Sequence, residues 1–551
     1  MKKLPFIPTS CLCACLLALL FAFGGVLWAP VCHAAPYTPD DAYLQDRAAL
    51  DELQRAAFAY IWEDGDPHSG MAYEVVGVWD SPPIAVGGTG FGIAAIVVAV
   101  DRGWIGREEA LQRLLRICLF LRDKSPRKEL HGAFPHWLDP HSGAILSFGK
   151  NDDGADIVET SLLMQGLLIA RAYFNGPGTE EKLRDIITGL WEDVDWNWFT
   201  NNEERGIYWH WSQQKGFSMG LKILGYNECL ITYVLAASSP THPISRAAYD
   251  YWTSGKGYKP KDLYGYRVEA SLSDAGPLFL THYSFIGLDP RRLADAFVPG
   301  GYFVRNCKQT LSNRAYCLYY APAKNRYSEQ CWGLSASQIK DGYAASSPGK
   351  DTGTISPTGA LSSMPYTPHY SLQFLHFLRG KLRNRIWGKN GPFDGFSLRD
   401  GWYSRSYLAI DQLPIVCMVE NYRSGLLWAM LMSDADVRRG LELAGLHEPE
   451  FGTGFPEMVV TLVREGKKNL PDACDLRRHP DSGLYQVPYW CVEAGQVQFT
   501  ISDPEGGIVY KLGQNSVKGR NLLSFPQFMR PDEEILTLTM RTASGEEHSL
   551  P

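Results

Sequence analysis

Three carboxylates at the start of one predicted helix are the residues best placed to do chemistry. Asp152, Asp156 and Glu159 stand at positions i, i+4 and i+7 of a segment that enters a helix predicted over 154–174, so their side chains lie along one helix face. Capping by Asp152 or Asp153 and the helix dipole explain two of these acids. They explain Glu159 poorly, because it lies beyond the first turn of an otherwise apolar helix. The three acids are therefore candidate catalytic residues.

A further isolated acid, Glu228, precedes an almost wholly apolar stretch in the segment Tyr226-Asn227-Glu228-Cys229-Leu230-Ile231. An acid at the start of a buried helix is either neutralised by a partner or has a raised pKa, and a raised pKa suits a general acid. A structural carboxylate that caps a neighbouring helix or pairs with an arginine is an equal alternative. Glu228 is thus a candidate proton donor.

Two more acids, Asp411 and Glu420, lie in apolar surroundings. Arg423 follows Glu420 by three residues, so a structural ion pair is at least as plausible as catalysis. Asp411 stands three residues before Pro414, a spacing that also fits an ordinary helix cap. Asp411 remains a candidate catalytic residue, and Glu420, Tyr422 and Arg423 are candidates for substrate binding.

Aromatic residues crowd the loops around these acids, and 16 Trp are more than the core requires. Aromatic rings stack on the apolar faces of sugars, although about half of them are expected to pack between helices instead. Carboxylates among aromatics indicate glycoside hydrolysis, in which a protonated acid donates to the leaving oxygen and a carboxylate activates water or attacks carbon. The candidates for substrate contact here are Trp209, Trp211, Tyr226, Asn227 and Trp332.

Other chemistries lack their motifs. The sequence contains no GxSxG or SxxK motif of an activated serine. It also has no CxxC or clustered Cys/His spacing, so no metal or cofactor is expected. The glycine-rich segment 87–92 lacks the Lys-Ser/Thr of a phosphate loop and follows no strand pattern, so it is interpreted as a tight helix entrance. The formal net charge of −7 argues against a general nucleic-acid binder.

The elements that must position these residues are predominantly helical. Apolar residues at helical spacing run through residues 41–447 and predict about a dozen helices. An (α/α)6 barrel, a double ring of six helical hairpins, is the first choice of fold, and an irregular all-α array is the alternative that helix count leaves open. Predicted helices include 272–287, 291–297, 359–379 and 412–433, and long aromatic loops are predicted at 125–150, 195–224 and 300–356.

The pattern changes after Pro449. Residues 496–511 alternate between apolar and polar side chains around an Asp503-Pro504-Glu505-Gly506-Gly507 turn, and 535–542 repeat the alternation. This predicts two or three antiparallel strands. We expect a small β-sandwich-like accessory domain at 450–551, next to a catalytic domain at 41–447.

Residues 1–34 have the pattern of a secretory signal peptide, with Lys2 and Lys3, an apolar run and small residues before cleavage near Ala34. A membrane anchor is the alternative, but no basic residues follow to stop transfer. No later segment reaches the ~18 apolar residues of a spanning helix. The mature protein is expected to be periplasmic or secreted and free of the membrane.

An exported protein can form disulfides. The predicted pairs are Cys307 with Cys317 and Cys474 with Cys491, because these residues lie in loop-like or strand-like sequence. Three other cysteines lie in apolar helical stretches and are expected to behave as small buried hydrophobes: Cys118, Cys229 and Cys417.

On these residues the chain resembles the glucoamylase-like proteins of glycoside hydrolase family 144, whose characterised members are β-1,2-glucanases. The resemblance covers about residues 45–447. It rests on four motifs: the glycine-rich segment 87–92, the D-x3-D-x2-E of Asp152, Asp156 and Glu159, the segment Gly225-Tyr226-Asn227-Glu228, and the segment Val419-Glu420-Asn421-Tyr422-Arg423-Ser424-Gly425.

The resemblance implies an (α/α)6 barrel that hydrolyses β-1,2-glucan to sophorose or sophoro-oligosaccharides by an inverting, metal-free mechanism. It places the family's important acids on the trio and on Glu228, with Glu228 as general acid, the base within the trio and Asp411 as a further participant. An inverting pair has carboxyl groups roughly 6.5–9.5 Å apart, and a separation near 5 Å indicates retention. The expected partner is a β-glucan bound by a monomer, and whether attack is endo or exo is left open.

Two alternatives from other classes remain at this point. A polysaccharide lyase on an α/α toroid grips uronate carboxylates with basic residues, whereas the candidate site here is acidic. A glycan-binding protein without catalysis would share the aromatic surface and the accessory module.

Overall fold

The computed structural model describes residues 41–203, 205–272 and 274–449, followed by seven strands between residues 477 and 550. The predicted signal peptide and Cys474 of the predicted C-terminal disulfide lie outside the described residues. Both stay predictions, as does the division of the chain into two domains.

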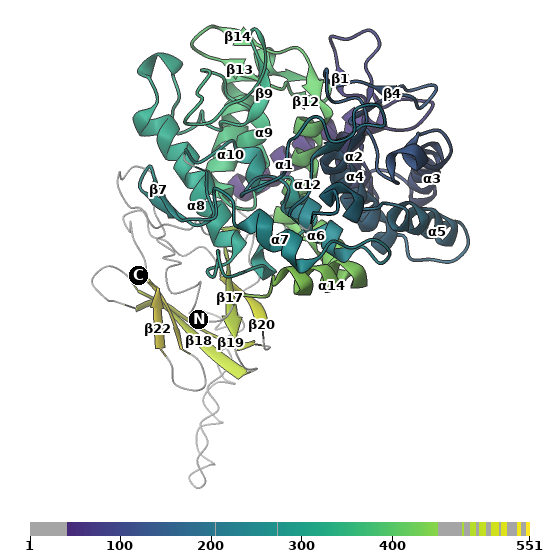
Figure 1. Ribbon diagram of the computed structural model, residues 1–551. Helices are drawn as coiled ribbons and strands as arrows, with labels where there is room; N and C mark the ends of the chain where they lie inside the picture. The colour runs from purple at the N-terminus through teal and green to yellow at the C-terminus, as the bar shows by residue number, and fades with distance from the viewer. Residues whose placement is uncertain are drawn as a thin grey trace, which may run out of the picture. The chain divides into compact units, whose positions relative to one another are not determined.

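Helices of two kinds build the part of the chain from residue 41 to 449 (Figure 1). Four are buried along nearly their whole surface: α2 (Val86–Asp101), α4 (Ile157–Tyr173), α6 (Leu230–Ser238) and α12 (Ala409–Arg423). Four others bury one face: α3 (Arg107–Asp123), α5 (Thr179–Glu192), α7 (Arg246–Thr253) and α14 (Ala435–Ala444). A helix that is apolar all round lies inside a protein, and an amphipathic one covers it. The mostly helical, layered fold is consistent with an α/α toroid.

Six further helices lie in the same part of the chain. They are α1 (Asp41–Trp62), α8 (Tyr302–Ala315), α9 (Pro357–Leu361), α10 (Pro368–Phe377), α11 (Arg383–Ile386) and α13 (Leu426–Ser433). The helix predicted over 359–379 is thus divided between α9 and α10, and that over 412–433 between α12 and α13. In each case a short turn interrupts a continuous apolar pattern.

Glycines allow α2 and α4 to pack against each other closely. A Cβ on Gly90 would lie 2.1 Å from the Leu162 carbonyl oxygen, and one on Gly166 would lie 2.0 Å from the Gly90 oxygen. Two helix backbones can come this close only where no side chain lies between them. The contact brings the starts of the two helices together, where the Gly87 N–H of α2 donates to Glu159 Oε2 of α4 at 2.7 Å.

Short antiparallel pairings hold the loops that lead into the buried helices. The strand before α2, β2 (Ile84–Ala85), pairs with β3 (Trp137–Leu138), which pairs with β4 (Ile145–Leu146). The strand before α4, β5 (Ala155–Asp156), pairs with β6 (His210–Trp211). The strand before α12, β15 (Tyr407–Leu408), pairs with β1 (Val75–Val76). Segments far apart in sequence therefore meet where α2, α4 and α12 begin.

Other strand pairs are local hairpins. They are β7 (Lys261–Leu263) with β8 (Tyr266–Val268), β9 (Ala336–Ile339) with β10 (Gly342–Ala345), β11 (Trp387–Gly388) with β12 (Gly391–Pro392), and β13 (Phe396–Ser397) with β14 (Trp402–Tyr403).

The C-terminal strands form two antiparallel sheets. One has the order β16 (Arg477–Arg478), β17 (Tyr485–Cys491), β20 (Gly519–Phe525). The other has the order β19 (Ile508–Ser516), β18 (Gly495–Ser502), β21 (Thr537–Arg541), β22 (Glu547–Leu550). β18 and β19 lie on either side of the predicted turn at 503–507, and β21 lies within the segment predicted at 535–542.

Two predicted helices are wrong. Residues 272–287 form 3-10 turns at Leu278–Thr281 and Ser284–Ile286, and 291–297 are irregular apart from a 3-10 turn at Pro290–Arg292. Gly276 takes φ +52° and Pro277 follows it. A left-handed glycine followed by a residue without an N–H cannot continue an α-helix.

The loop predicted over 300–356 is also wrong, because it contains α8 and the β9–β10 hairpin. The buried side of α8 mixes polar with apolar residues, which weakens the apolar periodicity that marks a helix. Its fully buried polar residues are Arg305, Asn306, Gln309, Thr310, Ser312 and Asn313. Arg305 donates to the carbonyl oxygen of Ala270, which shows that hydrogen bonds to backbone stand in for apolar contacts on this side.

The predicted disulfide between Cys307 and Cys317 is wrong. Both cysteines are buried thiols, and Cys307 Sγ donates to the Tyr366 carbonyl oxygen at 3.4 Å. Cys307 lies in α8 and Cys317 in the π-helical turn Tyr316–Tyr320 that continues it. Ten helical residues span about 15 Å, whereas a disulfide requires Cα atoms within about 7 Å. The prediction of buried free thiols is confirmed for Cys118, Cys229 and Cys417.

Within the described residues, the helices are all too short or too polar to cross a membrane.

The α2–α4 contact predicts opposite effects for two glycine substitutions. Gly166→Ala should lower the free energy of unfolding by about 1–3 kcal/mol, because the new methyl group has no room. Gly189→Ala, in α5 with no atom within 4 Å of the added Cβ, should be neutral or raise it by up to about 1 kcal/mol. Chemical denaturation of both variants measures the difference, and equal effects would contradict the proposed contact.

Candidate active site

The start of α4 organises the predicted acidic trio. Asp156 is the N-cap of this helix, and its Oδ1 accepts hydrogen bonds from the N–H groups of Val158 and Glu159, both at 2.9 Å. Its Oδ2 accepts from Trp209 Nε1 at 3.0 Å. The cap predicted at Asp152 or Asp153 is therefore corrected to Asp156. The β5–β6 pairing makes this possible, because it gives Asp156 the extended backbone of a cap.

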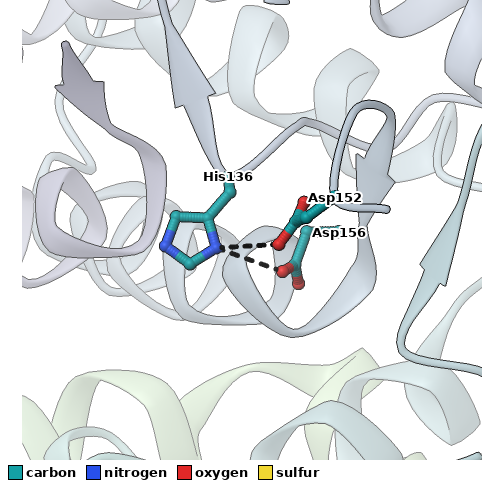
Figure 2. Close-up of side chains that lie close together, drawn as sticks. All are labelled: His136, Asp152 and Asp156. Atoms are coloured by element: carbon teal, nitrogen blue, oxygen red, sulfur yellow. Dashed lines mark ion pairs between the residues drawn. The ribbon is translucent and has the colours of Figure 1, made fainter. Parts of the chain in front are cut away.

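One histidine, His136, lies against all three acids, and Figure 2 shows its contacts with Asp152 and Asp156. His136 Nδ1 is 3.4 Å from Asp156 Oδ2 and 3.6 Å from Asp152 Oδ2, and its Nε2 is 4.0 Å from Glu159 Oε1. Burial disfavours the charged imidazole, but the three carboxylates outweigh it and raise the pKa of His136 well above its usual value. His136 is thus a cation at neutral pH within the trio.

Glu159 is the trio member whose titration falls near neutral pH. Burial raises its pKa to about 7, with further increases from the charges of Asp156 and Glu74, against the lowering by His136 and by the Gly87 N–H. A Cβ at position 87 would lie 2.5 Å from Glu159 Oε2. Glycine at this position therefore permits the hydrogen bond.

Glu228 lies just before α6 and interacts with the same cluster. Burial raises the pKa of Glu228, and the charge of Asp156 raises it further, while a hydrogen bond from its own backbone N–H opposes them. The residue keeps some solvent exposure. A proton donor needs this combination, in which the neutral form is favoured and the group stays accessible.

Asp411, in the first turn of α12, lies in a further acidic group with Asp394 and Glu74. Burial, then Asp394, raise the pKa of Asp411 well above its usual value, and Glu74 adds to the increase. Glu74 also acts on Glu159, and both Asp411 and Glu228 act on the Tyr283 hydroxyl. The structure therefore brings the five predicted catalytic acids together, although they come from three separate segments of the chain.

Comparisons with known proteins identify the family of the chain. The sequence model of a family described as "Putative glucoamylase" matches residues 220–435. A solved putative glucoamylase from Bacteroides caccae is 44% identical, with a TM-score of 0.70 over 73% of this chain and 100% of its own. An endo-β-1,2-glucanase from Chitinophaga pinensis, solved with sophorotriose and glucose, is 42% identical, with a TM-score of 0.69 over 73% of this chain and 99% of its own. The chain belongs to the glucoamylase-like proteins of glycoside hydrolase family 144.

A curated relative from Parabacteroides distasonis is named exo β-1,2-glucooligosaccharide sophorohydrolase (non-reducing end). It is 39% identical over 426 residues, which are 72% of this chain. The family 144 chain spans only 58% of that relative's length.

An aromatic wall in the family 144 chain lies beside the trio. The Phe148 ring stacks on His136 at 4.0 Å between centroids, and Trp137 meets Phe148 edge-on at 4.9 Å. Trp79 meets Trp137 edge-on at 6.1 Å. Phe148 is 52% exposed and Trp79 47% exposed. Exposed aromatic surface next to acids is what a sugar-binding site requires, because ring faces of sugars are apolar.

Three of the predicted substrate-binding residues are partly exposed near the trio. Trp209 donates to Asp156, and Trp211 lies opposite Ala155 in the β5–β6 pair. Asn227, next to Glu228, accepts a hydrogen bond from the Cys229 N–H at 3.0 Å. For these three, contact with substrate stays a prediction.

The other predicted substrate-binding residues are buried, and the structure gives them packing roles. Tyr226 and Trp332 are 1% and 0% exposed, and Arg305 lies 4.2 Å from the Tyr226 ring. Glu420 is fully buried and forms an ion pair at 2.8 Å with Arg102, which is partly exposed. Tyr422 is 8% exposed, and Arg423 contacts Asp51 at 2.6 Å. Glu420 therefore has an ion-pair partner, Arg102, that is distant in sequence.

Sequence reasoning missed His136, Glu74 and Asp394. His136 lies in a predicted loop with no charged neighbour in sequence, and Glu74 and Asp394 lie in loops where acids are ordinary. Their partners are distant along the chain, so periodicity and local motifs carry no signal for them. The aromatic run around His136 is the one local feature that singles out its loop.

His136, Asp152 and Asp156 also offer one atom each within 4.8 Å of one another, a spacing that a cation can bridge. The donor set does not favour one, because both Asp156 oxygens already accept N–H hydrogen bonds. We assign no metal to this site.

The trio predicts that His136 remains protonated above the ordinary range of histidine. Nitrogen NMR of 15N-histidine-labelled protein should show one imidazolium that persists above pH 7 and disappears in His136→Gln. His282 is an internal contrast, because burial lowers its pKa to about 3 and it should stay neutral. Since the folded pKa of His136 is raised, its stabilising effect is full below about pH 6.5 and declines as pH rises through the folded pKa. Neutral His136 at pH 7 would contradict the ion-pair assignment.

Proposed function

We propose that the protein is a glycoside hydrolase that cleaves β-1,2-glucan to sophorose or sophoro-oligosaccharides by an inverting mechanism. Relatives named as β-1,2-glucanases and as a sophorohydrolase support the substrate. The observation that carries the proposal is Glu228, a half-buried residue with a raised pKa that interacts with Asp156 of the acidic trio. A carboxyl group whose neutral form is favoured, close to a second carboxyl group, is the arrangement that acid/base glycoside hydrolysis needs.

Glu228 acts as the general acid in this mechanism. Its raised pKa keeps a proton available for the glycosidic oxygen as the bond to the leaving sugar breaks. No cation is among the groups that shift its titration. A permanent positive neighbour would have kept the group ionised and unable to donate.

Glu159 acts as the base that removes a proton from the attacking water. Asp156 is unsuited to this role, because N–H groups occupy both of its oxygens. Glu159 has one oxygen bound to the Gly87 N–H and the other 4.0 Å from the His136 cation. A base is most effective when its pKa lies near the working pH, and that of Glu159 is about 7. In this mechanism Asp152 interacts with His136 and acts neither as acid nor as base.

Exposed aromatic rings supply the sugar-binding surface. Trp79 and Phe148 offer ring surface beside His136, and Tyr343 on β10, 51% exposed, lies within the field of Asp411, Asp394 and Glu74. Rings on two sides of the acids can hold successive glucose units, while the acids act on the bond between them.

The finer architecture belongs to the same proposal. The all-round burial of α2, α4, α6 and α12 and the single buried faces of α3, α5 and α7 support an (α/α)6 barrel over 41–447. The two C-terminal sheets support a β-sandwich-like accessory domain within 450–551. The signal pattern of residues 1–34 supports export of a soluble monomer to the periplasm or beyond.

The central prediction is that Glu228→Gln abolishes turnover and leaves binding intact. The amide keeps the size of the side chain but has no acidic proton, so the release of reducing ends from β-1,2-glucan should fall by about 100-fold to 10,000-fold. Reducing-end assay and calorimetry with a sophoro-oligosaccharide measure the two effects. Incubation of wild type with β-1,2-, β-1,3-, β-1,4- and α-1,4-glucans, followed by product chromatography, tests the linkage.

Glu203→Gln is the matched control. Glu203 pairs with Lys222 at the surface, so its variant should keep wild-type turnover. Normal activity of Glu228→Gln would remove Glu228 from the mechanism. Glucan binding without cleavage by the wild type would favour the glycan-binding alternative, and unsaturated products would favour a lyase.

The pH profile distinguishes the two candidates for the base. In wild type, kcat/KM should rise as pH increases through about 7, because Glu159 must lose its proton. Glu159→Gln should lose this limb together with at least about 100-fold of the rate. Asp152→Asn should weaken activity while keeping the rise with pH. A profile flat between pH 5 and 8 would exclude Glu159 as the base.

A further inference from the structure

Two buried aspartates on the α12 side of the cluster have no role in the mechanism above. Asp394 precedes β13 and is 4% exposed, and Asp411 lies in the first turn of α12 and is 1% exposed. Each carboxyl group acts on the pKa of the other, so the two groups are neighbours. We propose that Asp394 is a positioning residue that shares one proton with Asp411, sets the pH at which Asp411 ionises and keeps Asp411 from acting as the base. The consequence for the base rests on the proposed function, whereas the shared proton does not.

A chain of hydrogen bonds fixes Asp394. The Gln338 N–H of β9 donates to Asp394 Oδ2 at 2.5 Å, and the Asp394 N–H donates to the Ser406 carbonyl oxygen at 3.1 Å. The Gln338 side chain accepts in turn from the hydroxyl groups of Ser404 and Ser406. The Gln338 N–H therefore orients the Asp394 carboxyl group, and the Ser406 carbonyl oxygen fixes the backbone of Asp394.

Asp411 is held from the opposite side and lacks one partner. The Tyr283 hydroxyl donates to Asp411 Oδ1 at 3.3 Å. Asp411 Oδ2 is buried, and no protein donor reaches it. A buried carboxylate oxygen without a donor is costly. A proton between Asp394 and Asp411 satisfies this oxygen and removes the repulsion between two like charges.

Among the described groups that interact with the two aspartates, none carries a positive charge that could neutralise them. They are Glu74, Tyr283 and Gln338 for the two carboxyl groups, while Tyr60 and Tyr343 feel the charges of the pair. Each of these is neutral or acidic. Burial raises the pKa of Asp394 to about 7 and that of Asp411 well above its usual value, in agreement with one retained proton at neutral pH.

The test is a titration read from the carboxyl groups themselves. Infrared spectroscopy of protein labelled with 13C at the aspartate carboxyl groups separates protonated aspartate from glutamate. In Asp394→Asn the neighbouring charge is gone, so the midpoint for loss of the protonated Asp411 band should move at least about one pH unit lower. Asp394→Ser should show the same shift and serves if the first variant does not fold.

Asp351→Asn is the matched control. Asp351 is a hydrogen-bonded carboxylate that accepts from Tyr316, Asn325 and Tyr327. Its loss should lower the thermal midpoint and leave the protonated-aspartate titration unchanged. An unchanged midpoint in both Asp394 variants would overturn the proposal. This titration needs no substrate. The shared proton can therefore be disproved while Glu228 proves essential for hydrolysis, and it can be demonstrated while Glu228 proves dispensable.

Discussion

The repulsion among carboxyl groups in one partly buried space is the constraint on which the site depends. Glu74, the trio, Glu228 and the Asp394–Asp411 pair interact electrostatically, and the low dielectric of their surroundings magnifies each interaction. They cannot all be ionised together. Different neighbours act on different acids: His136 and the Gly87 N–H oppose the effect of burial on Glu159, whereas burial favours protons on Glu228 and the aspartate pair. Acid and base roles follow from this division.

Contacts between the helices allow the carboxyl groups to lie close together. Gly90 and Gly166 let α2 and α4 approach each other, and the approach places the Gly87 N–H on Glu159. Both carboxylate oxygens of Asp156 accept hydrogen bonds from N–H groups, and these bonds fix the start of α4. Part of the cost of an acidic cluster is thereby offset by donors that belong to the fold and need not be rearranged for the reaction.

Burial divides the aromatic residues into two groups with different roles. Trp332 and Tyr226 fill the interior, whereas Trp79, Phe148 and Tyr343 keep exposed ring surface near the acids. The sequence shows all of them as similar members of aromatic loops. Type and local spacing do not reveal which side of a loop faces the interior, so sequence reasoning selected buried tryptophan and tyrosine residues along with accessible ones.

The sequence by itself determined the helical class, the five catalytic candidates and the family, because periodicity and short motifs are local properties of the chain. It failed where the signal was not local. The polar residues on the buried side of α8 obscure its helical pattern. The spacing of Cys307 and Cys317 does not reveal that both lie along one helical run, which keeps them apart. Only the tertiary structure decided that His136, Glu74 and Asp394 join the acids and that Glu420 pairs with Arg102. Charge–charge contacts between distant segments depend on how the helices pack, and no stretch of sequence encodes that alone.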